Sequence, residues 1–508
     1  MTGDFNIKRV AIIGAGYSGL QTLADLIHTS SNGESTINTG KLPSEPAFPY
    51  IKVFEQSPDL GGAWRYTAET DPHFPSKESL EDEYWEPSIL ENEKLKDGKT
   101  HNWKHNAMYD NLYTNISYNF MTPSTLPIKK YPNRIFDPFL THREVLKILH
   151  DLADHHDLRK YIQFNSDIKN VLKTEEGKYQ LTIERTNTNG EITIEIETFD
   201  SLVIATGRFK YPHIPQIHNL AEFNAQNPGV ISHSKSFRKS EDFKDKKVLI
   251  VGSSVSSIGL LEYLRPIAKE LHLSRRTFIN DPESSVYSWY VKEFNSGKIV
   301  QHDQIVDFDL ATNEVIFKNL ERAGGFDHIF LATGYHIHFP FLPKDNDNLA
   351  KISKSSGDQR GRIENLFHYV FSIGEPTIAH VGFTSSGFFV HLSEAQGVSI
   401  AGVWSNAKKL PSLEAQRQWH ADRIAQKAKS RTTHQYEPEE AVAEIEYLTG
   451  ELGVKNRGPK ITSRLNTALF EREKERLGVI YEKFASGEFD ESYILKTDTS
   501  GLPLPTLN

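Results

Sequence analysis

Residues 9–27 read RVAIIGAGYSGLQTLADLI, which is a β-branched run, a glycine-rich loop and a helix-like stretch in immediate succession. Gly14, Gly16 and Gly19 have the G-x-G-x-x-G spacing between a strand and a helix. In that context the first glycine permits a tight turn, the second lets the backbone approach a pyrophosphate, and the third lets the helix pack on the strand. The helix N-terminus also attracts phosphate charge. The stretch therefore predicts a Rossmann-like unit that binds a dinucleotide.

An acidic residue at the end of the next expected strand supports this interpretation. Residues 50–55 read YIKVFE, and Glu55 would accept hydrogen bonds from the adenosine ribose hydroxyls. Glu55 lies farther from the loop than the usual ~20 residues. The intervening residues 30–49 are rich in Ser, Asn, Gly, Thr and Pro, so an inserted surface loop accounts for the extra length.

An altered copy of the same pattern follows much later. Residues 247–251 read KVLIV and lead into GSSVSS at 252–257, followed by IGLLEYL. Gly252 is retained, but Ser254 and Ser257 stand where the fuller motif has glycines. A Cβ at Ser254 would push a pyrophosphate outward, so binding at this second loop is expected to be weaker or differently posed. Two such loops predict two dinucleotides held face to face, as redox chemistry between a nicotinamide and a flavin requires.

Composition excludes several classes of function. The chain has 508 residues, a prior of roughly three structural units, and a net charge of −9 from 58 basic and 67 acidic residues. The charges are dispersed, so no nucleic-acid partner is expected. Cysteine is absent, which excludes disulfides, thiolate metal sites, iron–sulfur clusters and a redox-active cysteine pair. A flavin disulfide reductase would lack its redox centre, and no metal site is expected.

The chain ends and hydropathy predict a cytoplasmic protein without a transmembrane anchor. The first residues, MTGDFNIKRV, contain no apolar leader, and no window approaches 18 uninterrupted apolar residues. A homo-oligomer is left open by the sequence.

Several motifs together resemble one family. Glu55, Gly61, Gly62 and Trp64 match the E-x(5)-G-G-x-W signature of flavin-containing monooxygenases, the class B flavoprotein monooxygenases. Residues 264–269, LRPIAK, are similar to the soluble fungal-type branch. Further matches follow in the family's order: Tyr113–Ile116 with Met121, Ala205–Gly207, Gly229 with His233, Ser234 and Phe237, Ala332–Tyr335, and Phe339–Leu342.

The resemblance implies an α/β fold with two dinucleotide-binding, Rossmann-like domains. The NADP domain would be inserted into a discontinuous FAD domain, with a helical C-terminal extension packed on the latter. The expected boundaries are residues 1–211 for the first part of the FAD domain, 212–334 for the NADPH domain, 335–410 for the return of the FAD domain, and 411–508 for the helical extension.

The resemblance also assigns the cofactor contacts. For FAD these are Gly14, Gly16, Tyr17, Ser18, Gly19, Glu55, Gly61, Gly62, Trp64, Thr206, Gly207 and Gln396. For NADPH they are Gly252, Ser253, Ser254, Ser256, Arg275, Arg276, Thr333, Gly334 and Tyr335. NADPH is favoured over NADH because no acidic residue ends the strand at 270–274 and a guanidinium suits a 2′-phosphate. The alternative is that Arg275 and Arg276 are two solvated surface arginines.

The activity implied by the resemblance is an NADPH- and O2-dependent monooxygenation. An FAD C4a-hydroperoxide would give its distal oxygen to a soft nucleophile, a sulfur or nitrogen atom of a small molecule. Asn115 is the expected catalytic residue, because its amide can donate to the peroxide oxygens without adding a titratable group; the alternative is a turn residue. Two other functions stay open: a Baeyer–Villiger monooxygenase acting on ketones, and a non-catalytic or oxidase-type dinucleotide-binding flavoprotein.

Overall fold

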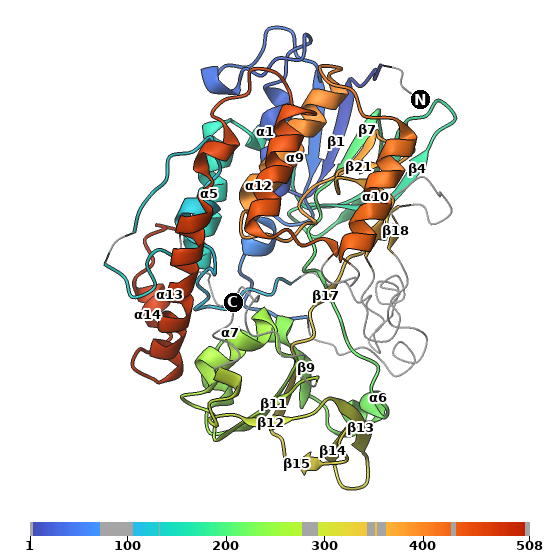
Figure 1. The fold of residues 1–508 in the computed structure, drawn as a ribbon. Coiled ribbons are helices and arrows are strands. Elements are labelled where there is room, and N and C mark those ends of the chain that lie inside the picture. Colours follow the sequence, from blue (N-terminus) through green and yellow to red (C-terminus); the bar gives the residue numbers. More distant parts are fainter. Residues whose placement is uncertain are drawn as a thin grey trace.

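The computed structural model describes residues 4–71, 105–131, 133–276, 293–342, 351–352, 362–427 and 433–502. Two bodies of unequal size lie one above the other in Figure 1. Each is built around a sheet whose central strands are parallel, and most of the helices lie on the larger body.

The larger body contains a seven-stranded sheet in the order β20-β21-β22-β7-β1-β2-β3. At its centre, β1 (Arg9–Ile13) runs parallel to both β2 (Tyr50–Phe54) and β7 (Ser201–Ile204). Central parallel strands are covered on both faces and therefore read as continuous apolar runs, which is what RVAII and SLVI are. The outer strands are β3 (Ile162–Gln163), β22 (Ile378–His380), β21 (Phe371–Ser372) and β20 (Leu366–Phe367).

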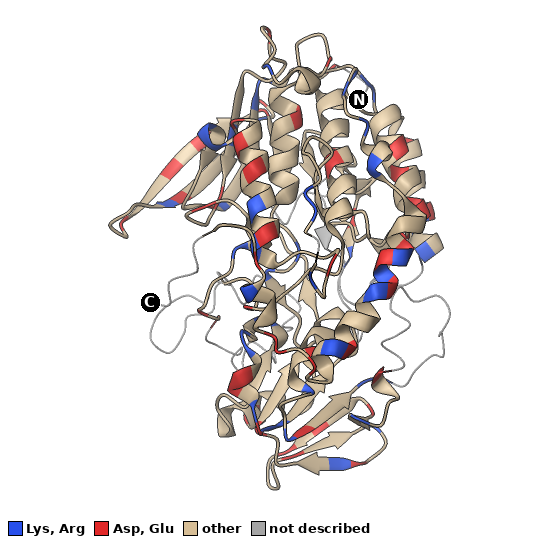
Figure 2. Cartoon of the chain, turned by 90° about the vertical axis from the view of Figure 1, so that its left-hand side faces the viewer, with Lys and Arg blue, Asp and Glu red and all other residues tan. Residues whose placement is uncertain are grey.

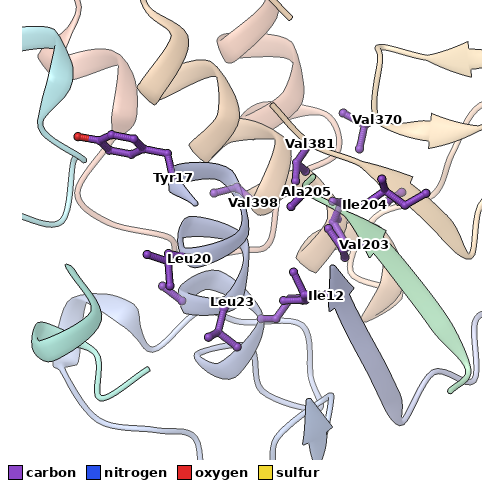
Figure 3. Close-up of a cluster of buried hydrophobic side chains, with 14 of the residues drawn as sticks. Ile12, Tyr17, Leu20, Leu23, Val203, Ile204, Ala205, Val370, Val381 and Val398 are labelled. Atoms are coloured by element: carbon purple, nitrogen blue, oxygen red, sulfur yellow. The ribbon is translucent and has the colours of Figure 1, made fainter. Parts of the chain in front are cut away.

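Helices α1 (Tyr17–Ile27) and α9 (Phe389–Trp404) form the layer that buries one face of this sheet. Figure 3 shows Ile12 of β1 and Val203 of β7 in one buried cluster with Leu23 of α1 and Val398 of α9. The two helices approach closely, because a Cβ at Gly397 would come within 2.9 Å of the Thr22 Cα. Residues almost four hundred positions apart thus build one core.

An antiparallel sheet of β4 (Ser166–Lys173), β5 (Tyr179–Thr186) and β6 (Ile192–Phe199) packs on β1 and β2. Strands β5 and β6 form an antiparallel hairpin, with Tyr179 opposite Phe199. The two-residue strands β18 (Lys351–Ile352) and β19 (Ile363–Glu364) form a separate antiparallel pair.

The smaller body has a five-stranded, all-parallel sheet in the order β12-β11-β10-β16-β9. Its strands are β9 (Ile231–His233), β10 (Lys247–Val251), β11 (Glu270–Ser274), β12 (Val300–His302) and β16 (His328–Leu331). Helix α7 (Val255–Leu264) follows β10, as α1 follows β1. A small antiparallel sheet of β13 (Ile305–Asp309), β14 (Glu314–Phe317) and β15 (Arg322–Gly324) completes it.

The chain enters and leaves the smaller body through paired strands. β8 (Tyr211–Pro212) and β17 (Tyr335–His336) lie antiparallel, and the His213 amide donates to the Gly334 carbonyl at 2.7 Å. The predicted fold class is confirmed: an α/β chain with two Rossmann-like units, the second inserted into the first, and a helical C-terminal part. The numerical domain boundaries stay a prediction, which this pairing at 211–213 and 334–336 supports.

Most of the remaining helices lie on the larger body, where α13 also contacts α7 of the smaller one. They are α4 (Tyr118–Met121), α5 (His142–His155), α6 (Leu220–Gln226), α10 (Leu413–Lys427), α12 (Pro438–Gly450), α13 (Thr467–Ala485) and α14 (Tyr493–Lys496), with α6 in the smaller body. Short 3-10 turns lie at Ile37–Thr39, Gly62–Trp64, Arg159–Tyr161, Ser234–Ser236, Ser240–Phe243 and Ile461–Arg464.

The exposed charges are mixed rather than segregated. Figure 2 shows Lys and Arg interspersed with Asp and Glu on the face in view. Among the helices that the structure describes, none combines the length and apolar character needed to cross a bilayer.

A buried charged cluster joins α1, α9 and the C-terminal part. The guanidinium of Arg457 binds Asp25 of α1 at 3.1 Å and also pairs with Glu394 of α9, and it donates to Ser124 Oγ at 2.7 Å. The three charged side chains are at most 5% exposed. Burial raises the pKa of Asp25 to about 6 although Arg457 opposes that shift. Removing the one cation would leave two carboxylates buried together.

We expect Arg457→Met to lower the free energy of unfolding by about 3–5 kcal/mol, because breaking a buried pair strands uncompensated charge. Urea titration followed by tryptophan fluorescence measures the loss. Arg322→Met is the matched control, because Arg322 pairs with Asp309 at 48% exposure, and a solvent-exposed ion pair contributes little to stability. The urea midpoint of this variant should stay close to that of the parent. Equal losses for the two variants would contradict the interpretation.

Candidate functional site

The first glycine loop is shaped by contacts that only glycine permits. Gly14 has φ +107°, and a Cβ there would lie 2.6 Å from the Ala205 carbonyl oxygen at the end of β7. At Gly19 a Cβ would lie 2.0 Å from the Gly14 carbonyl oxygen. Gly16 differs: its φ is −86°, and a Cβ would meet Gly62 Cα at 3.6 Å, an ordinary contact. The fold itself therefore demands Gly14 and Gly19, whereas Gly16 leaves space beside the loop.

The Gly61-Gly62 motif lies directly against this loop. The Gly61 amide donates to the Ala15 carbonyl at 3.0 Å, and a Cβ at Gly62 would come 3.0 Å from Gly16 Cα. We call the five glycines the glycine cradle: Gly14, Gly16, Gly19, Gly61 and Gly62. Asn106 Nδ2 closes its outer side by donating to the carbonyls of Gly62 and Arg65 at 3.0 and 2.9 Å. Trp64, on the same turn, packs partly buried against the main core.

Glu55 lies at the edge of the cradle. Its carboxylate accepts from the Ala15 amide at 2.8 Å and from the Ser57 amide at 2.9 Å. The sequence predicts contacts with ribose hydroxyls instead. Each carboxylate oxygen keeps a second acceptor site, so the two backbone bonds orient the side chain without excluding a ribose.

Unsatisfied polar atoms mark the carboxyl edge of the first sheet. Thr206 Oγ1 and Thr384 Oγ1, in the loops after β7 and β22, are buried with no hydrogen-bond partner among the described residues. Gln396 Nε2 is likewise unpartnered, while Gln396 Oε1 accepts from the Gly382 amide at 3.0 Å. Ser18 lies against Gly382, where a Cβ would come 2.1 Å from its Oγ. Buried polar atoms of this kind need a polar ligand or water, so the edge fits a dinucleotide.

The second loop approaches the strand beside it as the first loop does, but it has a serine where the first loop has its third glycine. Gly252 has φ +114°, and a Cβ there would lie 2.5 Å from the Ala332 carbonyl oxygen. Ser257, at the position equivalent to Gly19, donates from Oγ to the Gly252 carbonyl at 2.7 Å. Ser253 and Ser254 are exposed and Ser256 is half-buried. The hydroxyl of Ser257 thus replaces close packing with a hydrogen bond.

Arg275 follows β11 directly beside the second loop, because the Gly252 amide donates to the Ser274 carbonyl at 2.9 Å. Its guanidinium donates to Asn295 Oδ1 at 3.2 Å and lies 5.1 Å from the Phe294 ring centre. Burial lowers the pKa of Arg275 to about 10. Arg276 is exposed next to it. Both arginines therefore lie at the carboxyl edge of the second sheet, and their contact with a 2′-phosphate stays a prediction.

The predicted residues after β16 lie at the crossing between the two bodies. Thr333 Oγ1 donates to the His213 carbonyl, and the Gly334 carbonyl accepts from His233 Nε2 at 3.0 Å. His233 Nδ1 accepts from the Lys235 amide at 3.1 Å, so its proton is assigned to Nε2. The Tyr335 ring packs edge-on to His233 at 5.1 Å. These contacts brace the crossing; they do not by themselves test nucleotide contact.

Asn115 is half-buried at a bend of the chain. The turn is held by Thr114, whose amide donates to the Leu140 carbonyl at 2.8 Å. Downstream, Ser117 Oγ and Asn119 Nδ2 both donate to Glu473 of α13. Figure 3 shows Tyr17 pointing away from the core cluster.

The Tyr17 hydroxyl donates to the Met121 carbonyl at 2.7 Å and so ties this segment to α1. The catalytic role of Asn115 stays a prediction.

Sequence reasoning missed Arg238, which clamps several segments together. Its guanidinium donates to five main-chain carbonyls at 2.8 to 2.9 Å: Thr67, Glu69, Asn106, Lys235 and Phe237. Beside it Lys235 pairs with Asp71, both buried, and burial lowers the pKa of Lys235 to about 8. Main-chain acceptors carry no side-chain signature, so no sequence signal identifies this clamp.

Comparisons with known sequences give a family. A model of the flavin-binding monooxygenase-like family matches residues 87–282 and 292–466, well over half of the chain. Flavin-containing monooxygenase FMO GS-OX4 of Arabidopsis thaliana is 25% identical over 418 residues, covering 80% of this chain and 76% of its own length. Flavin-containing monooxygenase ustF2 of Aspergillus flavus is 23% identical over 437 residues, covering 80% and 83%. Plant and fungal relatives match similarly, so the fungal-type branch stays a prediction.

A solved structure supports the fold. S-allyl-L-cysteine S-oxygenase from Allium sativum superposes with a TM-score of 0.70 at 22% identity, covering 97% of this chain and 98% of that one.

Gly19→Ala and Ser257→Ala test what holds the third position of each loop: close packing in the first and a hydrogen bond in the second. We expect Gly19→Ala to cost about 3 kcal/mol or more of unfolding free energy, because backbone must move. Ser257→Ala should cost about 1 kcal/mol, one hydrogen bond. Gly450→Ala, where a Cβ meets nothing within 4 Å, is the control and should be within about 0.5 kcal/mol of the parent. Urea unfolding measures all three; a Gly19→Ala protein as stable as Gly450→Ala would refute the packing argument.

Proposed function

Because this chain belongs to the flavin-binding monooxygenase-like family, we propose that it is an FAD-containing, NADPH-dependent monooxygenase. It places one atom of O2 on a sulfur or nitrogen atom of a small-molecule substrate. One observation carries the proposal: two glycine loops of the same design, each turned against a carbonyl at Ala205 or Ala332, lie at the carboxyl ends of the parallel strands of two sheets. Dinucleotides bind at such edges.

FAD is assigned to the larger body. The glycine cradle leaves backbone exposed to a pyrophosphate, and Glu55 stands at the adenosine end. The unpartnered atoms of Thr206 and Gln396 would bind polar groups of the rest of the molecule. When bound, flavin supplies the redox chemistry, accepting hydride from a nicotinamide and activating O2.

NADPH is assigned to the smaller body. A phosphate would meet the amides at the start of α7 beside Ser253, Ser254 and Ser256, and Arg275 with Arg276 would take the 2′-phosphate. The exposed serines make this loop more open than the cradle. A cofactor that arrives, reacts and leaves fits such a loop, whereas the closed cradle suits one that stays.

Asn115 is the chain's own group proposed to act on the activated oxygen. Its amide can donate a hydrogen bond but cannot deliver or remove a proton near neutral pH. His233 is committed to the Gly334 carbonyl, so its imidazole serves the crossing between the bodies. The protein's work is to bind, orient and exclude water. We place the enzyme in the cytoplasm, for which the cysteine-free sequence is the supporting observation.

The test is NADPH-dependent O2 uptake by the purified flavoprotein with a thioether, a tertiary amine and a cyclic ketone. We expect sulfoxide or N-oxide in proportion to NADPH oxidised. With NADH, kcat/KM should fall roughly 10- to 100-fold, the value of one to two charge-assisted hydrogen bonds. Lactone as the only product would establish the Baeyer–Villiger alternative. Hydrogen peroxide alone would indicate an oxidase, and no O2 uptake a non-catalytic flavoprotein; each outcome overturns the proposal.

Asn115→Ala tests the residue. We expect FAD content to persist while product per NADPH oxidised falls roughly tenfold, because a hydrogen bond to the activated oxygen is lost. Asn119→Ala is the control from the same segment: its amide binds Glu473 of α13, so it should lower thermal stability without changing the coupling ratio. A normal product yield from Asn115→Ala would remove it from the site.

A further inference from the structure

Helix α7, which begins at the second glycine loop, contacts the segment that leads to Asn115 at several points. We call residues 109–115 the Asn115 segment. The Tyr109 hydroxyl fills the space beside Gly259, where a Cβ would come within 2.8 Å of it. Tyr263 donates to the Asn111 carbonyl at 2.9 Å. Tyr113 donates to Glu262 Oε1 at 2.7 Å. Of these contacts, the one made by Tyr113 lies nearest to Asn115 in the sequence.

The same segment is anchored on its other side to the larger body. The Leu112 carbonyl accepts from the His142 amide at 3.1 Å. The Tyr113 ring packs against Phe136, Phe139 and Phe484 with centroids 5.8 to 6.3 Å apart. The ring is thus held by the larger body while its hydroxyl reaches α7. The bond to Glu262 bridges the two bodies two residues before Asn115.

Glu262 is a buried carboxyl that the fold does not use in an ion pair. Its side chain has no Lys or Arg within ion-pair distance in the described part of the chain. Burial raises its pKa to about 8, with the bond from Tyr113 opposing. The titratable groups that face it are Tyr109 and Tyr113 of the segment, Tyr263 of its own helix and Tyr481 of α13. Glu491, which accepts from the Ser240 amide, lies near Tyr109 and Tyr263.

We propose that Glu262 is a positioning residue: through Tyr113 it couples dinucleotide binding at the second loop to the placement of Asn115. The inference rests on the proposed function. Physically, α7 is one rigid rod from its N-cap at Ser254 to Glu262, about 12 Å at 1.5 Å per residue. A ligand that orders the first turn of α7 therefore orders its last turn, and with it the hydroxyl of Tyr113. Asn115 is then held in place when the nicotinamide dinucleotide is present.

The experiment measures amide hydrogen exchange in the Asn115 segment of the purified flavoprotein, with and without saturating NADP⁺. The reporters are the amides of Asp110, Leu112 and Thr114, which are bonded to Arg238, Tyr109 and Leu140 carbonyls. In the parent protein we expect NADP⁺ to slow their exchange by roughly two- to tenfold, the value of one hydrogen bond. Glu262→Leu and Tyr113→Phe should lose this slowing, and Glu262→Gln, which keeps an acceptor oxygen, should retain it.

Repeating the exchange measurement at two pH values shows whether Glu262 positions the Asn115 segment or only stabilises the fold. Burial raises the folded-state pKa of Glu262 to about 8, so the carboxyl is neutral below that pH and ionises above it. The Tyr113 hydroxyl donates a stronger hydrogen bond to the carboxylate than to the neutral carboxyl, so the contact strengthens as pH rises through about 8. The NADP⁺ effect in the parent should therefore be larger at about pH 9 than at about pH 6.5. Glu262→Gln, which does not titrate, should show the same effect at both pH values. The phenols of Tyr109, Tyr263 and Tyr481 have raised pKa values and stay protonated over this range.

Glu241→Gln is the matched control, because Glu241 is an exposed carboxylate of the same body; it should behave as the parent. Coupling of NADPH oxidation to product provides the second readout and should fall in Glu262→Leu with FAD content intact. Unaltered NADP⁺ protection in both Glu262→Leu and Tyr113→Phe would overturn the inference. Failure of the parent to bind NADP⁺ would instead overturn the proposed function, so the two failures are distinguishable.

Discussion

The structure depends on one steric constraint that it uses twice: a main-chain carbonyl occupies the place where a Cβ would begin. The Ala205 carbonyl does this at Gly14 and the Ala332 carbonyl does it at Gly252. Each carbonyl belongs to the alanine of an Ala-Thr-Gly sequence that directly follows an apolar strand, so the two units repeat each other at the contact of strand and loop. Because the turn must pass under that carbonyl, the loop amides point outward to the carboxyl edge of each sheet, where a phosphate can reach them.

The two copies then diverge in a way that fits different residence times. In the first, Gly19 allows α1 to approach Gly14 with no room for a side chain, and Gly61-Gly62 covers the loop from outside. In the second, Ser257 spans the equivalent gap with a hydrogen bond, and no second glycine pair covers the loop among the residues that the structure describes. The closed cradle suits a dinucleotide that stays bound, and the open loop suits one that exchanges.

Desolvated charge joins elements that are distant in the sequence. Arg457 holds α1 to α9, and Arg238 collects carbonyls from the segments that lie between the two bodies. A buried charge without a partner destabilises the fold. A buried charge whose hydrogen bonds are all made holds the segments that supply its partners in one arrangement, because every partner must be present at once. Glu262 is the exception, a buried carboxyl whose described partner is a phenol, and it lies on the line from the second loop to Asn115. The site is therefore set by contacts between the bodies as much as by the loops themselves.

The amino-acid sequence was enough to predict the local elements and the two loops, since the β-branched runs and the glycine spacings act over fewer than twenty residues. It also placed Glu55, Gly61 and Gly62 near the first loop, because their spacing is a recognisable signature. Other contacts are visible only in the folded chain. Gly62 lies against Gly16, and Gln396 accepts a hydrogen bond from Gly382. Arg238 binds five main-chain carbonyls, and Tyr113 binds Glu262. Those contacts join residues tens to hundreds of positions apart, and their acceptors are often main-chain carbonyls that every residue carries. Periodicity and motif spacing report only on neighbours in the chain, so such contacts leave no mark there.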